Sequence, residues 1–122
     1  MKILAGLFCG LAMLLAQTSE GVREGSFDIR FEPTAKLQTR VQVPFQITVK
    51  DARHQPLPNA KVTLQIGNQD PRATQIFPAP QVGPGIYLAK PVFPTSGEWS
   101  LYVQVERERL KSARTLQFAV VE

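Results

Sequence analysis

The chain has 122 residues and a formal net charge of +4 at pH 7, with 43% hydrophobic and 20% charged residues. These values are ordinary for one globular domain. The positive charge is too small to indicate a nucleic-acid-binding protein, so we expect no nucleic acid among its partners. Ten prolines and eight glycines separate short apolar runs, which is typical of strands joined by turns.

The first sixteen residues differ from the rest of the chain. Lys2 precedes an almost wholly apolar run over residues 3–16, about fourteen residues, whereas a membrane-spanning helix needs about 20. Residues 1–16 therefore predict a signal peptide cleaved before Gln17, and a secreted or extracytoplasmic protein of the periplasm or cell envelope. An uncleaved N-terminal anchor is the alternative. Lipidation of Cys9 is disfavoured because bulky residues precede it.

Cleavage would remove the single cysteine and both methionines, and would leave His54 as the one histidine. The remaining domain would form no disulfide, although an extracytoplasmic compartment permits one. Its stability would come from the core alone, which is sufficient for a domain of about 106 residues.

Residues 17–25 are polar and lack apolar periodicity, so they predict a flexible linker. Residues 26–122 predict an all-β fold, an immunoglobulin-like β-sandwich of about seven antiparallel strands. We expect the strands at residues 26–32, 41–50, 60–66, 72–77, 86–93, 97–105 and 116–120.

The strand at 97–105 is expected to be central. Trp99, Leu101, Val103 and Val105 fall on one side of it, and Tyr102 lies on the other with polar neighbours. Burial of Trp99, the only tryptophan, would remove more apolar area than burial of any other side chain.

The longest strict alternation places Val41, Val43, Phe45, Ile47 and Val49 on the inner face of one strand. Pro44 cannot donate a ladder hydrogen bond, so it should face an edge or precede the main pairing. Pro91 interrupts the strand at 86–93 in the same way.

Two motifs resemble a known family. Asp51 with residues 55–62 resembles the turn D-x-x-G-x-P-x-x-x-A-x-V of bacterial immunoglobulin-like domains, and residues 85–89 followed by 97–103 resemble G-x-Y-x-A … G-x-W-x-L-x-V. In this order they resemble the YtkA-like family of extracytoplasmic domains, to which FixH-type proteins are related. Gln55 stands where the family turn usually has glycine, so we expect this turn to differ.

The resemblance implies a link to copper handling or cytochrome oxidase assembly. Some members place methionine or histidine between the third and fifth strands, but residues 67–75 of this chain contain no usual copper ligand except Asp70. A lone His54 without thiol, thioether or second imidazole makes no metal site. We therefore expect no metal residue and no cofactor.

No catalytic arrangement emerges, so we expect a protein that is not an enzyme. Ser96, Ser100 and Ser112 lack the context of a nucleophile elbow. His54 and Asp51 lie three residues apart in one predicted turn, where Asp51 is a turn former and neither residue would orient a nucleophile.

The run 106–114 is the one strongly charged segment. It predicts a solvated hairpin that protects a sheet edge, or part of a basic contact surface. Immunoglobulin topology would gather three loops at one end, near the proline-rich residues 77–85. This surface comprises Arg53, His54, Arg107, Arg109 and Lys111. It suits a protein partner in the cell envelope with an acidic surface, or a weak contact with anionic lipid.

These observations favour a non-enzymatic extracytoplasmic interaction or accessory module. A structural or adhesive domain of the cell envelope is the alternative. A metal or small-molecule carrier would require ligands that this chain lacks.

Overall fold

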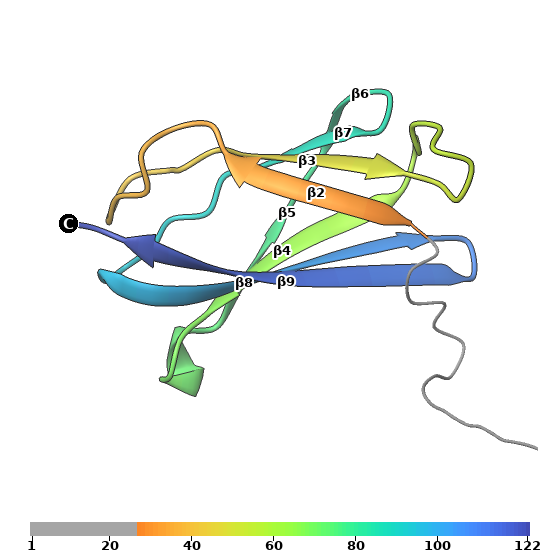
Figure 1. Cartoon of the computed structure of the whole chain (residues 1–122). Helices are drawn as coiled ribbons and strands as arrows, with labels where there is room; N and C mark the ends of the chain where they lie inside the picture. The colour runs from red at the N-terminus through yellow and green to blue at the C-terminus, as the bar shows by residue number, and fades with distance from the viewer. Residues whose placement is uncertain (1–26) are drawn as a thin grey trace, which may run out of the picture.

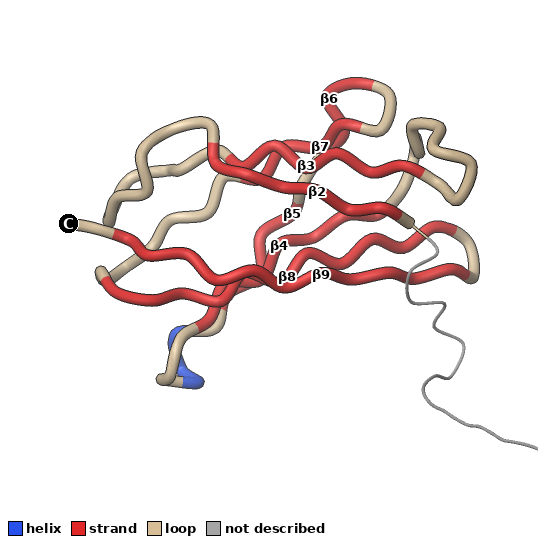
Figure 2. The backbone as a smooth tube through the Cα atoms, viewed as in Figure 1, coloured by secondary structure: helices blue, strands red, loops and turns tan. Residues whose placement is uncertain are grey.

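The computed structural model describes residues 27–122, and the predicted signal peptide (1–16) and linker (17–25) lie outside them. Two four-stranded antiparallel sheets pack face to face (Figure 1, Figure 2). In spatial order, the first contains β2 (Asp28–Pro33), β3 (Phe45–Lys50), β7 (Ile86–Ala89) and β6 (Gln81–Gly83). The second contains β5 (Gln75–Pro78), β4 (Lys61–Gly67), β8 (Gly97–Arg107) and β9 (Leu110–Val120). A short 3-10 helix, η2 (Pro71–Ala73), precedes β5.

The strand order identifies the sandwich. Constant-type immunoglobulin domains pair strands A, B, E and D in one sheet and C, F and G in the other. Here β2, β3, β7 and β6 occupy the positions A, B, E and D, and β4, β8 and β9 occupy C, F and G. β5 extends the second sheet beside β4. The predicted immunoglobulin-like β-sandwich is therefore confirmed.

The core lies between the sheets and is centred on β8. Trp99, Leu101, Val103 and Val105 are fully buried, whereas Tyr102 on the opposite face is 36% exposed, as the alternation predicts. The Trp99 ring packs edge-on against Phe93 with 5.5 Å between centroids. Its indole N–H donates to the carbonyl of Thr95 at 2.9 Å, so its one polar atom is satisfied despite burial.

Prolines shift the predicted strand boundaries. The strand expected at 41–50 begins only at Phe45. The prediction that Val41 points inward is wrong, because Val41 is 46% exposed. Pro44 directly precedes the main pairing, as expected, and the N–H of Val43 donates to the carbonyl of Pro91 at 3.0 Å. The strand expected at 86–93 ends at Ala89 for the same reason, since Pro91 has no N–H to donate.

Three further boundaries differ from the prediction. Residues 71–73 are a 3-10 helix, because Asp70 caps it by accepting the N–H of Arg72, and the following strand starts at Gln75. The last strand begins at Leu110 instead of residue 116, so the charged segment is a hairpin. Residues 81–83, expected to be loop, form β6. The part of the chain from 27 to 122 thus has eight strands, one more than predicted.

Side chains close the gap between the edge strands β2 and β9. The Arg114 guanidinium donates from Nη1 to the carbonyl of Ile29 at 2.8 Å. The N–H of Phe27 donates to Oγ of Ser112 at 3.1 Å. Farther along, residues 37–39 run parallel to the end of the chain, with Thr39 N–H donating to the carbonyl of Val121 at 2.9 Å. Among residues 27–122, no helix is long and apolar enough to cross a membrane.

Candidate contact surface at one end of the sandwich

Three connections meet at the end of the sandwich where β3 and β8 finish and where β4, β7 and β9 start (Figure 1). They are the β3–β4 loop (residues 51–60), the β6–β7 turn (residues 84–85) and the β8–β9 turn (residues 108–109). The β6–β7 and β8–β9 turns each join two antiparallel ladder partners, and the β3–β4 loop crosses between the sheets to Lys61, which is registered opposite Glu106 at the same end.

A carboxylate organises the first half of the β3–β4 loop. Oδ1 of Asp51 accepts the N–H of Arg53 at 2.8 Å and that of Gln55 at 3.0 Å. The hydrogen bond from Gln55 and then that from Arg53 hold the pKa of the Asp51 carboxyl below its usual range. Because the pKa of Asp51 is lower in the folded chain, its hydrogen bonds stabilise the fold fully above the unfolded-state pKa of about 3.9. This stabilisation is lost as the pH falls through the folded-state pKa. Asp51 is therefore a turn former, as predicted.

The glycine position of this turn was assigned to the wrong residue. His54, not Gln55, adopts the left-handed conformation, with φ of 63°. Glycine occupies that region without steric cost, and histidine is among the residues that tolerate it. His54, which is exposed, therefore holds the left-handed position of this turn.

The second half of the loop is tied to the core by Tyr87. Its hydroxyl donates to the carbonyl of Leu57 at 2.7 Å and accepts the N–H of Ala60 at 3.0 Å. The side chain of Tyr87 is fully buried. Because one hydroxyl satisfies a donor and an acceptor of the same loop, Tyr87 fixes where the loop crosses from one sheet to the other.

We expect Tyr87→Phe to destabilise the fold by about 1–3 kcal/mol. It keeps the buried ring but leaves the Leu57 carbonyl and the Ala60 N–H without their partner, and an unsatisfied buried group costs that amount. Chemical denaturation with a fluorescence readout measures the change. Tyr102→Phe is the matched control, because the exposed Tyr102 hydroxyl reaches only Gln104 at 3.5 Å and its loss should cost less than about 0.5 kcal/mol. Equal effects would contradict the anchoring role of Tyr87.

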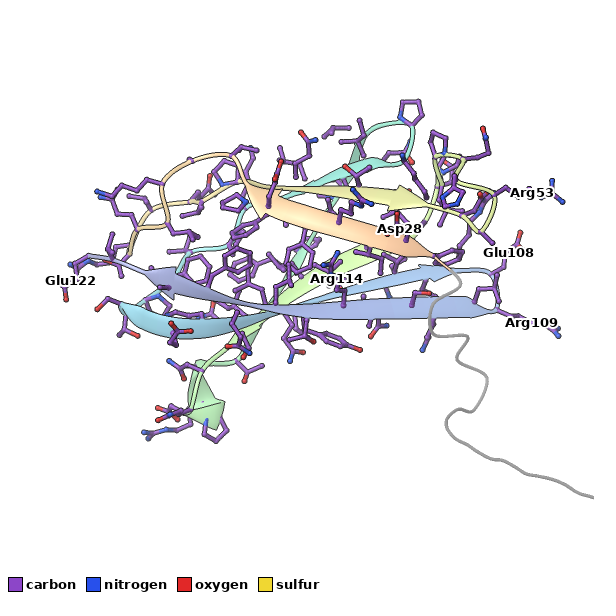
Figure 3. All side chains as sticks on the ribbon, viewed as in Figure 1. Asp28, Arg53, Glu108, Arg109, Arg114 and Glu122 are labelled. Carbon is purple, nitrogen blue, oxygen red and sulfur yellow. The ribbon has the colours of Figure 1, made fainter. Side chains whose placement is uncertain are left out.

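The five predicted basic residues lie at this end of the sandwich, which we call the basic end. Arg53, His54 and Arg109 are exposed, and Arg107 and Lys111 are half-buried. Figure 3 shows Arg53 and Arg109 projecting outward from the same end, with Glu108 nearby. Within residues 27–122 the ion pairs are Arg30–Asp28 and Arg72–Asp70, so none of the basic-end side chains is paired with a described carboxylate.

Two further cations at this end were missed by the sequence analysis. Lys50 ends β3 and Lys61 begins β4, and both are exposed. The sequence alone could have indicated Lys50 and Lys61, because both flank the predicted loop that carries Arg53. Four carboxylates dilute this charge: Asp28, which is registered opposite Lys50, and Asp51, Glu106 and Glu108. Glu106 lies between Lys61 and Lys111 in the sheet register.

The proline-rich residues 77–85 are not the loop that was expected near these cations. Phe77 and Pro78 belong to β5, and residues 81–83 form β6. Gly85 is the part that lies against the β3–β4 loop, because a Cβ there would fall 2.8 Å from Cβ of Pro56, and its carbonyl accepts the N–H of Val49 in β3 at 2.8 Å.

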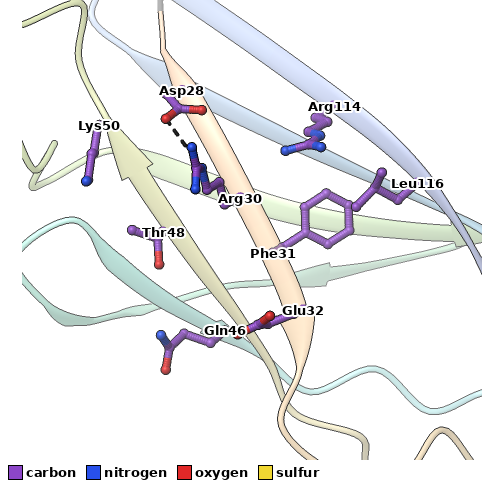
Figure 4. Close-up of a pocket in the computed structure, with 9 residues that line it drawn as sticks. All are labelled: Asp28, Arg30, Phe31, Glu32, Gln46, Thr48, Lys50, Arg114 and Leu116. Atoms are coloured by element: carbon purple, nitrogen blue, oxygen red, sulfur yellow. Dashed lines mark ion pairs between the residues drawn. The ribbon is translucent and has the colours of Figure 1, made fainter. Parts of the chain in front are cut away.

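A groove of about 590 Å³ lies over β2, β3 and the edge of β9 (Figure 4). Its cations are partly engaged: Arg30 pairs with Asp28 at 3.6 Å, and Arg114 is bound to the Ile29 carbonyl. Thr48 is its one hydroxyl, with no imidazole beside it. The lining residues are Asp28, Arg30, Phe31, Glu32, Gln46, Thr48, Lys50, Arg114 and Leu116.

Two of the three candidate serines have structural partners. Ser112 is 2% exposed and its Oγ accepts from Phe27, while Oγ of Ser100 accepts from the Gln117 amide at 2.8 Å. Ser96 is exposed in the connection before β8. In the described part of the chain, no three His, Cys, Asp or Glu side chains gather as a metal site.

Comparison of the chain with models of known protein families gives no match, and comparison with curated proteins gives none either.

Proposed function

We propose that the chain is a non-enzymatic extracytoplasmic interaction module whose basic end contacts an acidic partner protein in the cell envelope. The observation that supports it is the set of cations at the basic end, which lie outside any ion pair with described residues. Unpaired exposed cations raise the association rate with an acidic surface and select against basic ones.

The turns that carry these cations are held in place by the sandwich, which suits recognition of a partner protein. Arg53 sits in a turn fixed by Asp51, and Arg109 sits in a two-residue turn between long strands. Binding residues are commonly carried on loops that a rigid scaffold positions, because the scaffold lowers the entropy lost on binding. Arginine adds planar, bidentate recognition of carboxylates.

The resemblance to YtkA-like and FixH-related domains extends the proposal to an accessory role in metal handling or cytochrome oxidase assembly. In that role the module would act by contact with a partner and not by carrying metal, because residues 17–122 contain neither cysteine nor methionine. Oxidase or copper-transport genes beside its own would support this extension, and cell-wall or polymer genes would contradict it.

Site-specific photo-crosslinking in the exporting cell tests the contact. A photoreactive amino acid at Glu108, between the basic-end cations, should capture one defined envelope protein with an acidic surface. Arg53→Glu with Arg109→Glu should reduce the yield at least tenfold, because each reversed charge opposes association. The same reversal at Lys36 and Lys90, which are exposed away from the basic end, is the matched control and should leave the yield unchanged.

Two results would overturn the proposal. One is a crosslinking yield that the basic-end reversal leaves unchanged. The other is capture by anionic lipid instead of protein, which vesicle flotation tests with purified protein and phosphatidylglycerol vesicles. Strong flotation that is lost in the Arg53→Glu, Arg109→Glu variant would assign the basic end to the membrane surface.

A further inference from the structure

The outer faces of the two sheets differ in charge. On the first sheet, the registered positions Asp28–Lys50, Arg30–Thr48–Ile86 and Glu32–Gln46–Leu88 mix both signs of charge with polar and apolar residues. On the second sheet, three successive rows carry no charge at all. These rows, which we call the Tyr102 face, are Ile76–Gln65–Tyr102–Thr115, Pro78–Thr63–Gln104–Ala113 and Gly67–Ser100–Gln117.

The composition of the Tyr102 face is that of an interface. Tyr102 stands in its middle row and is 36% exposed, and Ile76 in the same row is 64% exposed. Around them are hydroxyl and amide side chains, such as the pair Gln117–Ser100. Interface centres are depleted of charge and enriched in aromatic residues, and tyrosine with small polar neighbours supplies area and adaptable hydrogen bonding.

The charges that border this face differ between its two ends. At one end lies the row Lys61–Glu106–Lys111, with two cations and one anion. At the other end lies Glu98, which lines a shallow hollow with Asn68, Gln69 and Asp70, and the charge of Asp70 is offset by its ion pair with Arg72 at 3.1 Å. Tyr102 is midway between Glu98 and Glu106 along β8. The net charge is therefore positive at one border and negative at the other. Both borders lie four residues from Tyr102 along β8.

We infer that the Tyr102 face binds a second copy of this chain in a two-fold symmetric dimer. A two-fold axis along the row of Tyr102 lays β8 antiparallel over β8 of the second copy and brings the two Tyr102 rings together. The same rotation places Glu98 opposite Glu106 of the second copy, which is flanked by that copy's Lys61 and Lys111, so Glu98 faces a row of two cations and one anion. An isologous interface requires such a self-complementary surface, and an uncharged centre avoids repulsion of like charges across the axis.

The size of the face sets the expected strength. With its two borders included, the face covers four strands spaced about 4.8 Å apart and the eight residue steps from Glu98 to Glu106 at about 3.3 Å each, which gives about 19 Å by 26 Å, or about 500 Å² in projection. A standard interface buries about 800 Å² of accessible surface per partner. We therefore expect a weak dimer with a Kd in the micromolar range or above.

Sedimentation equilibrium of the chain without residues 1–16, from about 1 µM to about 1 mM, tests the dimer over this range. Tyr102→Lys should raise the Kd about 100-fold or more, because it places two ammonium groups together on the axis. Thr48→Lys, a lysine at the middle of the other sheet's outer face, is the matched control and should leave the Kd unchanged. Thr115→Lys on β9 is a second test of the Tyr102 face if Tyr102→Lys folds poorly.

A charge swap tests the orientation of the two copies. Glu98→Lys should weaken the dimer, and adding Lys111→Glu should restore it, because the double variant inverts the net charge at both borders of the face. Three results would overturn the inference: a monomer at the highest concentration, a dimer that survives both Tyr102→Lys and Thr115→Lys, or equal weakening by Thr48→Lys. If the Tyr102 face binds a different protein instead, the chain stays monomeric at the highest concentration.

Discussion

Trp99→Ala should destabilise the domain by about 3–5 kcal/mol, the largest loss that we expect from one side chain. Trp99 is fully buried between the sheets, packs edge-on against Phe93 and donates its indole N–H to Thr95. Truncation removes these contacts and leaves a cavity that neighbouring β-strands cannot close, because both ladders of β8 hold its backbone in place. Urea denaturation followed by circular dichroism measures the change without relying on the lost tryptophan.

Tyr102→Ala on the same strand is the control. Tyr102 points away from the core, so its removal should cost less than about 1 kcal/mol. The comparison requires dilute protein, so that association through the Tyr102 face does not add to stability. Equal shifts of the two urea midpoints would mean that the outer face of β8 is as well packed as the inner one, contrary to its exposure.

Gly85→Ala should destabilise the domain by about 2–5 kcal/mol, since it combines two costs. Gly85 has φ of +70°, a conformation that costs an L-residue about 1–2 kcal/mol. A Cβ there would also lie 2.8 Å from Cβ of Pro56 and 2.9 Å from the carbonyl oxygen of Val49. Overpacking of this kind costs about 1–3 kcal/mol more. Thermal and urea unfolding both report the loss.

Two other glycines separate these costs. Gly97→Ala tests the backbone cost alone, because Gly97 has φ of +119° and no atom lies within 4 Å of the position that a Cβ would occupy. Gly83→Ala should be nearly neutral, since its Cβ would make only ordinary contacts with Ile86, the nearest at 3.8 Å. If Gly85→Ala resembled Gly97→Ala, the close approach of the turn to Pro56 would contribute nothing.

The parts of the fold that were predicted correctly depend on local alternation. The period-two pattern from Trp99 to Val105 gives the buried face of β8 directly, because one side chain in two must enter the core. Phe27, Ile29 and Phe31 follow the same rule, and all three are buried. Pro44 correctly indicated where the main pairing of the strand begins. It did not indicate that Val41 is exposed, because the exposure of Val41 depends on where the chain leaves the sheet.

The parts that were missed depend on partners distant in sequence. β6 has only three residues and exists because β7 pairs with it, and no propensity over three residues predicts that. The charged run after Glu106 extends a strand because its hairpin partner β8 continues to Arg107.

The position of the basic residues in turns at one end of the fold was predicted from the sequence, whereas the contacts that hold these turns were not. Arg53 and Arg109 are marked by charge in turns, which sequence alone shows. Tyr87 was quoted only as part of a motif, and its role in anchoring the loop required the distances to Leu57 and Ala60. The uncharged Tyr102 face was invisible in the sequence, because its rows join four strands whose register only the folded chain defines.

The parallel contact between residues 37–39 and Val121 has a mechanical consequence. β2 and β9 run in the same direction, so Phe27 and Glu122 lie at opposite ends of the sandwich (Figure 1). A pulling force applied between these two residues therefore runs along the strands and slides residues 37–39 against Val121. The hydrogen bonds from Thr39 to Val121 and from Val121 to Leu37 then bear the load together instead of opening in turn. The sandwich is thereby suited to resist tension along its length at the point where its first and last segments meet.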